Sequence, residues 1–150
     1  MGRKVPPIKG EKKRVLWISD AVSHTGFSRI SHDLLELLYM KYDIHVLGIN
    51  YKGDPHEYPY KIYPAGIKGD MYGLGRLPEL LNSVQPDIVF MINDPWIVSG
   101  YLDVLVDYKN RAVDWNMSHE EKVSLPRYIA YMPIDGLNLR KEYGNDLNKL

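Results

Sequence analysis

The sequence predicts an α/β fold in which helices flank a mainly parallel, doubly wound sheet. Short apolar runs without alternation, typical of strands buried on both faces, recur along the chain. Segments between them place apolar residues every three or four positions, which is the spacing of one helix face. This alternation of strands and helices favours parallel strands joined by right-handed crossovers.

The first half of the chain is expected to form three strands and one helix. Residues 14–19 (RVLWIS) and 44–49 (IHVLGI) are apolar runs of buried strands, and residues 60–64 (YKIYP) alternate, which favours a short strand near a sheet edge. Apolar residues at 27, 30, 34, 35 and 38 predict a helix that ends at residue 39 or 40. Four glycines between residues 66 and 75 predict a mobile loop.

The second half repeats the pattern. Residues 77–84 have helical spacing, with Pro78 in the first turn, and residues 88–92 (IVFMI) predict the fourth strand. A helix is expected at residues 95–108. The polar stretch 109–126, which ends in proline, is interpreted as an irregular excursion with one helical turn at 118–121. Residues 128–132 (YIAYM) predict the fifth strand, and residues 137–150 a charged helix.

Composition excludes several classes of function. The 150 residues fit one domain, or part of a larger protein, and carry 19 Lys and Arg against 19 Asp and Glu. No basic excess therefore points to nucleic acid. Without cysteine there are no disulfides, thiolate metal sites or cysteine nucleophiles. Residues 1–13 are interpreted as a flexible basic segment, and no stretch is apolar enough for a signal peptide or membrane span, so we expect a cytoplasmic protein.

The predicted site lies at the carboxyl ends of the strands, where ligands bind in open parallel sheets. Four loops leave these ends, at residues 19–28, 50–54, 93–96 and 132–136, and each combines an acid with glycine, proline or asparagine. We expect these loops to meet at one edge of the sheet.

The loop after the first strand is the candidate anion site. Gly26, Phe27, Ser28 and Arg29 open the helix, where free backbone N–H groups and the helix dipole favour a phosphate. Gly26 leaves room for close approach and Arg29 adds a bidentate donor. The structural alternative is a turn glycine with Thr25 or Ser28 as an ordinary N-cap.

Familiar chemical motifs are missing around this loop. Neither G-x-G-x-x-G nor G-K-[ST] follows the first strand, which argues against a nicotinamide-dependent enzyme or a P-loop. Asp20 has Val22 two positions on rather than the second acid of a phosphoryl-accepting magnesium site. His24 and His32 lack metal-ligand spacing, so no metal is expected. No G-x-S-x-G nucleophile elbow is present.

Two acids at the ends of neighbouring strands are candidates for binding a sugar. Asn93, Asp94 and Trp96 follow the fourth strand, and Asp135 follows the fifth. Carboxylates accept hydrogen bonds from hydroxyl groups, and an indole can stack on the apolar face of a sugar ring. The alternative is that Asp94 and Asp135 cap the following helices, and the two roles are compatible.

Four stretches of the chain carry a resemblance to a known family: KRVLWISDAVSHTGFSRISHDLLELL, VLGINYKGDPHEYPYKIYPAG, QPDIVFMINDPW and YIAYMPIDG. Taken in this order, they resemble the amino-terminal half of GT-B glycosyltransferases of family 4, the group 1 type. The resemblance covers about residues 13–137. It implies a Rossmann-like domain at 14–150 that faces a second such domain across a cleft. It also implies a hexosyltransferase that is usually retaining and uses a nucleotide-sugar donor, with no cofactor and no bound metal.

The family motifs transfer to this chain residue by residue. The family's glycine-rich loop, which approaches the donor phosphates, corresponds to Thr25, Gly26, Phe27, Ser28 and Arg29; many members have two adjacent glycines where this chain has Thr25 and Gly26. Asp20 and His24 then line the cleft. The family often has a histidine after the fifth strand, and here Asp135 is the nearest residue able to act in catalysis.

The resemblance further implies a carboxyl-terminal donor domain with a paired-glutamate motif, which is missing from these residues. We therefore expect the chain to be the acceptor-side half of a transferase, inactive by itself. Its partners would be a nucleotide sugar, a sugar or lipid acceptor, and that second domain; with a lipid acceptor it would work at the membrane surface. The alternative is a stand-alone carbohydrate- or nucleotide-binding module without catalysis.

Overall fold

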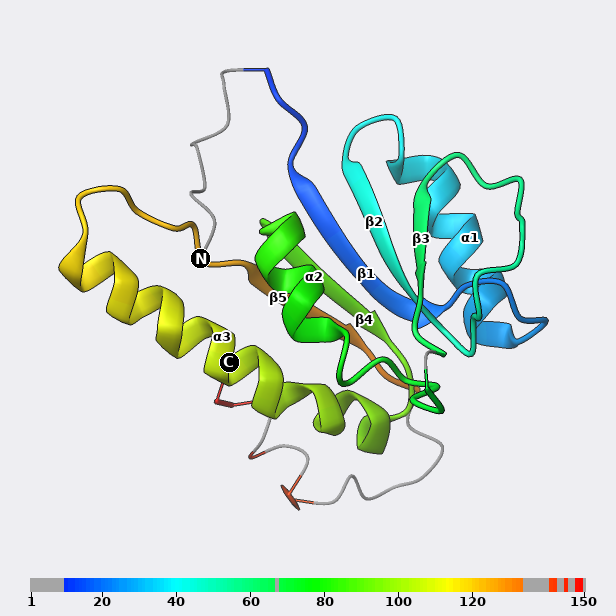
Figure 1. Ribbon diagram of the computed structural model, residues 1–150. Coiled ribbons are helices and arrows are strands. Elements are labelled where there is room, and N and C mark those ends of the chain that lie inside the picture. Colours follow the sequence, from blue (N-terminus) through cyan, green and yellow to red (C-terminus); the bar gives the residue numbers. More distant parts are fainter. Residues whose placement is uncertain (1–9, 67, 134–140, 143–144, 146–147, 150) are drawn as a thin grey trace.

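The computed structural model describes residues 10–66, 68–133, 141–142, 145 and 148–149. Five strands form one sheet in the order β3-β2-β1-β4-β5, and every neighbouring pair is parallel (Figure 1). The predicted α/β class is thus confirmed. The elements are β1 (Arg14–Asp20), α1 (Gly26–Leu38), β2 (Asp43–Ile49), β3 (Lys61–Pro64), α2 (Leu77–Val84), β4 (Ile88–Ile92), α3 (Pro95–Ser118) and β5 (Arg127–Tyr131).

Helices cover both faces of the sheet, with α1 on one face and α2 and α3 on the other (Figure 1). Side chains of β1 alternate between the two cores, because successive residues of a strand point to opposite faces. Trp17 packs with Leu35 of α1, whereas Leu16 packs with Leu81 of α2 and Leu105 of α3. This double covering explains why β1 is an uninterrupted apolar run.

The buried indole of Trp17 adds a polar network to the core under α1. Its ring stacks on Phe90 of β4, with centroids 4.1 Å apart. The indole N–H donates to the Ser31 hydroxyl over 3.1 Å, and Ser31 donates in turn to Ser19 over 2.8 Å. These bonds fix α1 against β1 while satisfying three buried polar groups.

The helix α3 corrects one expectation. It runs without interruption to Ser118, so residues 109–118 are helical rather than irregular, and no helical turn follows at 119–121. The polar stretch is the solvent face of the helix: Tyr108 and Ala112 are buried one turn apart, and Arg111 pairs with Asp107 over 3.0 Å. In the last turn of α3, the Asn116 side chain bonds the backbone of Val123, where the chain turns back toward β5.

The sheet order places a switch point between β1 and β4. The chain moves from β1 to β2 and β3 on one side, then returns to lay β4 and β5 on the other. Loops that leave β1 and β4 therefore diverge to opposite faces of the sheet and leave a crevice between them, the usual ligand site of such folds. This crevice is where the predicted loops at 19–28 and 93–96 lie.

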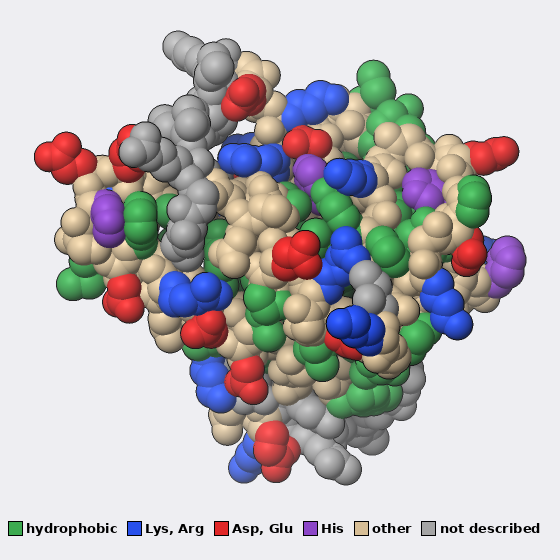
Figure 2. All heavy atoms as spheres, in the orientation of Figure 1, with side chains coloured by type: hydrophobic (Ala, Val, Ile, Leu, Met, Phe, Trp, Pro, Cys, Tyr) green, Lys and Arg blue, Asp and Glu red, His purple; other side chains and the backbone are tan. Residues whose placement is uncertain are grey.

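Charged side chains of both signs are interspersed over the face that carries α2 and α3 (Figure 2). Among the described residues, no helix is long and apolar enough to cross a membrane. The expected flexible segment at 1–13 and the expected helix at 137–150 fall largely outside the described residues.

Candidate functional site

A cavity of about 480 Å³ opens at the carboxyl edge of the sheet between the loops after β1 and β4. We call it the Asp94 cavity. Its lining comes from β1, α1, β2 and the loops after β1, β2, β3 and β4, and comprises Asp20, Thr25, Gly26, Phe27, Ile30, Ile49, Asn50, Tyr72, Asn93 and Asp94. Five of the residues predicted from sequence are thereby brought together: Asp20, Gly26, Phe27, Asn93 and Asp94.

Asp20 organises the loops around the cavity. The residue is buried at the end of β1, where one carboxylate oxygen accepts from the Thr25 hydroxyl over 2.9 Å and the other from the Asn50 amide over 3.2 Å. Asn50 has a positive φ of 59°, a conformation that asparagine tolerates better than most residues. Asp20 thus joins the loop after β1 to the loop after β2.

Thr25 is the N-cap of α1, as the structural alternative predicts. Its side-chain oxygen accepts from the Ser28 backbone N–H over 3.1 Å, and the Arg29 N–H bonds the Thr25 carbonyl. Within the part of the chain that the structure describes, the N–H groups of Gly26 and Phe27 have no partner. The cap therefore leaves two donors at the positive end of the helix, beside the cavity.

Gly26 leaves that helix end open. A Cβ placed on Gly26 would meet no atom within 4 Å, and the residue has no left-handed φ. Glycine is therefore not required here by the fold. Its effect is to let a ligand approach the free N–H groups closely.

Ser28 and Arg29 differ from their neighbours in the predicted anion loop. Ser28 is buried, and its hydroxyl donates to the Ala21 carbonyl over 3.1 Å. Its side chain therefore stabilises the loop after β1 from within the protein. Arg29 is exposed and lies on the other side of the loop from the Asp94 cavity. Its guanidinium forms no ion pair or hydrogen bond with the described residues, which leaves it available to an anion.

Asp94 occupies the N-cap position of α3 without acting as a side-chain cap. Its carbonyl accepts from the Ile97 and Val98 N–H groups, and its own N–H donates to the Asn93 side chain over 2.9 Å. Within the described residues its carboxylate has no hydrogen-bond or ion-pair partner, although it lines the cavity. Trp96 is 57% exposed and lines neither this cavity nor the one described next.

Tyr72 is a cavity residue that the sequence did not indicate. It lies in the glycine-rich loop, which several contacts hold in place: Asp70 accepts from the N–H groups of Gly73 and Gly75, and Tyr101 donates to the Tyr72 carbonyl over 2.6 Å. These backbone N–H groups, that of Gly75 first, lower the pKa of Asp70. Only the turn-forming glycines marked this loop, and nothing in their spacing shows where Tyr72 points.

A second cavity, of about 500 Å³, lies on the other side of the same loop. We call it the Tyr58 cavity. It shares Thr25 and Gly26 with the Asp94 cavity and also contains the predicted residues His24, Ser28 and Arg29. The remaining lining is Val22, Ser23, His32, Asp33 and Tyr58.

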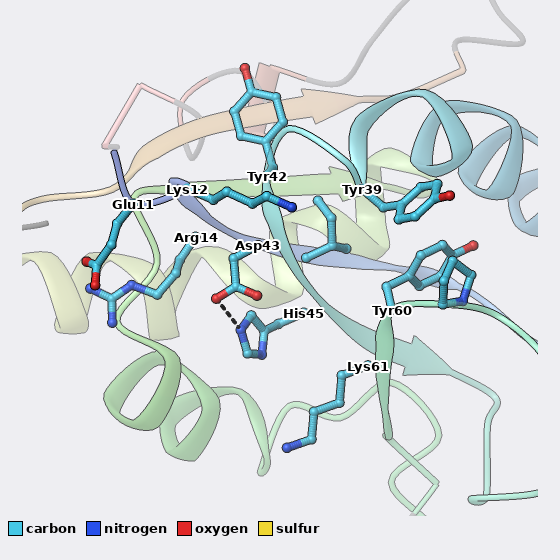
Figure 3. Close-up of a pocket in the computed structure, with 11 residues that line it drawn as sticks. Glu11, Lys12, Arg14, Tyr39, Tyr42, Asp43, His45, Tyr60 and Lys61 are labelled. Carbon is cyan, nitrogen blue, oxygen red and sulfur yellow. Dashed lines mark ion pairs between the residues drawn. The ribbon is translucent and has the colours of Figure 1, made fainter. Parts of the chain in front are cut away.

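A larger cavity, of about 850 Å³, lies at the opposite edge, where the strands begin (Figure 3). Basic and acidic side chains are mixed there, and His45 pairs with Asp43 over 3.3 Å and with the Tyr63 hydroxyl over 2.9 Å. Size alone does not identify a site. Because the loops that leave the strands converge at the carboxyl edge, we assign the candidate site to that edge.

The chain matches no protein-family model and none of the curated proteins with which it was compared. Asp135, the residue expected to act in catalysis, lies outside the described residues. Among the described residues, no three His, Asp or Glu side chains are grouped so that they could hold a metal ion. The geometry of the two cavities is therefore the basis for assigning a function.

Proposed function

We propose that this chain is the acceptor-side half of a glycosyltransferase that uses a nucleotide-sugar donor, of the GT-B family 4 type. The observation that supports it most directly is the pairing of groups in the Asp94 cavity. The two free N–H donors at the start of α1 and the unpartnered Asp94 carboxylate line one cavity at the switch point of the sheet.

Each group matches one part of such a donor. Free N–H groups at a helix N-terminus bind phosphate, and Gly26 permits the close approach that this requires. In sugar transfer the bond between the anomeric carbon and the phosphate oxygen breaks, and negative charge develops on the departing diphosphate. Donors already aimed at that oxygen lower the barrier. Asp94 and Asn93 would accept from or donate to the hydroxyl groups of the sugar.

The transferase would need a second domain to complete the donor site. One half of an interdomain cleft supplies only part of the groups that hold a nucleotide sugar, and domain closure would bring the rest together. We propose that this domain supplies the paired glutamates for the donor ribose and phosphate, and that Asp135 acts near the transferred sugar.

The experiment is an assay of the complete gene product that contains this chain. Release of nucleoside diphosphate from a panel of UDP-, GDP- and ADP-sugars is measured for the wild type and for the variants Gly26→Val and Asp94→Asn. Hydrogen bonds to charged groups contribute about 1.5–3 kcal/mol, so each variant is expected to lower kcat/KM about tenfold or more.

A matched variant controls for changes in fold. Asp103→Asn makes the same substitution at an exposed position of α3, away from the cavity, and is expected to leave kcat/KM unchanged. Thermal unfolding of all variants shows whether each is folded. A folded wild-type protein that releases no nucleoside diphosphate from any donor, or full activity in both cavity variants, would contradict the proposed function.

A further inference from the structure

Five aromatic rings form a continuous cluster, which we call the aromatic cluster, beside the loop after β1; three of them, His32, Tyr58 and Tyr60, are stacked. They belong to α1 and to the segment between β2 and β3, and comprise Tyr51, His56, Tyr58, His32 and Tyr60. The Tyr58 ring lies flat on His32, with centroids 3.7 Å apart and 7° between the planes. Tyr60 and His56 lie 5.7 and 5.8 Å from Tyr58. The arrangement holds the segment between the strands against α1.

His32 joins the aromatic cluster to the loop after β1. In neutral His32, the Nε2–H group donates to the Ala21 carbonyl, and Nδ1 accepts from the Tyr60 hydroxyl. Ala21 is the residue directly after β1, and its carbonyl also accepts from Ser28. The aromatic rings and the predicted anion loop are therefore joined through the Ala21 carbonyl.

The Tyr58 side chain is 39% exposed although one face of its ring covers His32. It forms a wall of the Tyr58 cavity, whose other lining is mostly polar. Arg29 and Asp33 lie four positions apart on α1, and both reach this cavity. The buried Ser23 hydroxyl, another lining residue, has no hydrogen-bond partner among the described residues.

We propose, on the basis of the function proposed above, that the Tyr58 cavity binds a sugar ring of the acceptor. A pyranose has an apolar C–H face, which stacks on an aromatic ring, and a rim of hydroxyl groups that needs donors and acceptors. Tyr58 provides the ring, Arg29 donates and Asp33 accepts. A polar cavity of this kind does not fit a lipid acyl chain.

The position of the cavity suits an acceptor. It meets the Asp94 cavity at Thr25 and Gly26, so a donor in one and an acceptor in the other would approach each other over the start of α1. Transfer requires this, because the acceptor hydroxyl must reach the anomeric carbon as the bond to the phosphate oxygen breaks. The new C–O bond then forms while the hydroxyl proton passes to the departing diphosphate.

Binding is tested by NMR on the 150-residue chain, titrated with methyl glycosides, short oligosaccharides and short-chain lipid micelles. Sugars are expected to perturb the amides around Tyr58 and Arg29. Loss of the stacked ring in Tyr58→Ala is expected to weaken binding about tenfold, whereas Tyr58→Phe stays within about twofold, since only the hydroxyl is removed. The exposed Tyr131→Ala, on β5, is the matched control.

Unchanged sugar affinity in folded Tyr58→Ala, perturbations that map elsewhere, or binding of the lipid alone would overturn the acceptor site. The assay of the complete gene product separates this inference from the proposed function. Transfer with an unchanged acceptor KM in Tyr58→Ala refutes the Tyr58 cavity alone. Sugar binding at Tyr58 in a protein that uses no nucleotide sugar refutes the transferase and, with it, the role of this cavity as an acceptor site.

Discussion

At the residue scale, Gly26 is a position that the proposed ligand requires but the stability of the fold does not. Because a Cβ there meets no atom within 4 Å and the backbone is not left-handed, Gly26→Ala restricts the unfolded chain without straining the native one. We expect the substitution to raise the free energy of unfolding by about 0.4–1 kcal/mol. Urea denaturation measures it. A loss of stability would show that the fold itself requires glycine at this position.

Substitution of Asp20, by contrast, is expected to lower the free energy of unfolding. Its buried carboxylate bonds both Thr25 and Asn50, so Asp20→Ala leaves two donors without their acceptor. We expect a loss of about 2–4 kcal/mol in the free energy of unfolding. The exposed Asp103→Ala should change it by less than about 0.5 kcal/mol. Equal effects of the two substitutions in urea denaturation would refute a structural role for Asp20.

The free energy of unfolding is expected to depend on pH through His32. Burial, above all, lowers the pKa of His32 below its ordinary value of 6.5, so the unfolded chain binds this proton more readily than the folded one. The associated stability is complete above pH 6.5 and is lost as the pH falls toward the lowered folded-state pKa. The free energy of unfolding should therefore rise as the pH increases toward 6.5, and His32→Gln should flatten that rise. The same slope in both proteins would contradict this assignment.

Residue chemistry could be predicted from sequence where it depends on neighbours along the chain. Thr25 as an N-cap, the free donors at Gly26 and the position of Asp94 at a strand end all follow from local pattern. Tyr72 and Tyr58 could not be predicted, because each reaches its cavity through contacts with distant residues, such as Tyr101 and His32.

At the scale of elements, the length of α3 is the informative case. Polarity at residues 109–118 concealed a helix because only one face of it is buried, through Tyr108 and Ala112. The segment holds neither glycine nor proline, which in retrospect is the local signal that favours continuation. The five strands and the helices α1 and α2 were predicted to within a residue or two, since short apolar runs mark the strands and apolar spacing of three or four marks the helices.

Asn110→Pro tests the extended helix directly. Asn110 is exposed in the interior of α3, where proline removes a backbone hydrogen bond and clashes with the preceding turn. We expect a loss of about 3 kcal/mol in the free energy of unfolding, whereas Asn110→Ala should preserve or slightly increase it. A proline variant as stable as the wild type would contradict the extended helix and support the irregular excursion that the polar sequence predicts.

At the scale of the whole molecule, the strand order determines where chemistry is possible. Parallel strands bring all the loops after β1, β2 and β4 to one edge, and the switch between β1 and β4 opens the Asp94 cavity among them. The alternation of elements predicted this edge. It could not predict that one loop would divide the edge into two cavities, because that depends on how α1 and the segment after β2 pack together.

The central claim is that this edge holds the phosphate of a nucleotide sugar. The most direct measurement is the rate of nucleoside diphosphate release from a panel of nucleotide sugars by the complete gene product, compared with its Gly26→Val variant. We predict release from at least one donor, with kcat/KM lowered about tenfold or more in the variant while its fold is kept. Equal rates in the two folded proteins, or no release by the wild type from any donor, would contradict the claim.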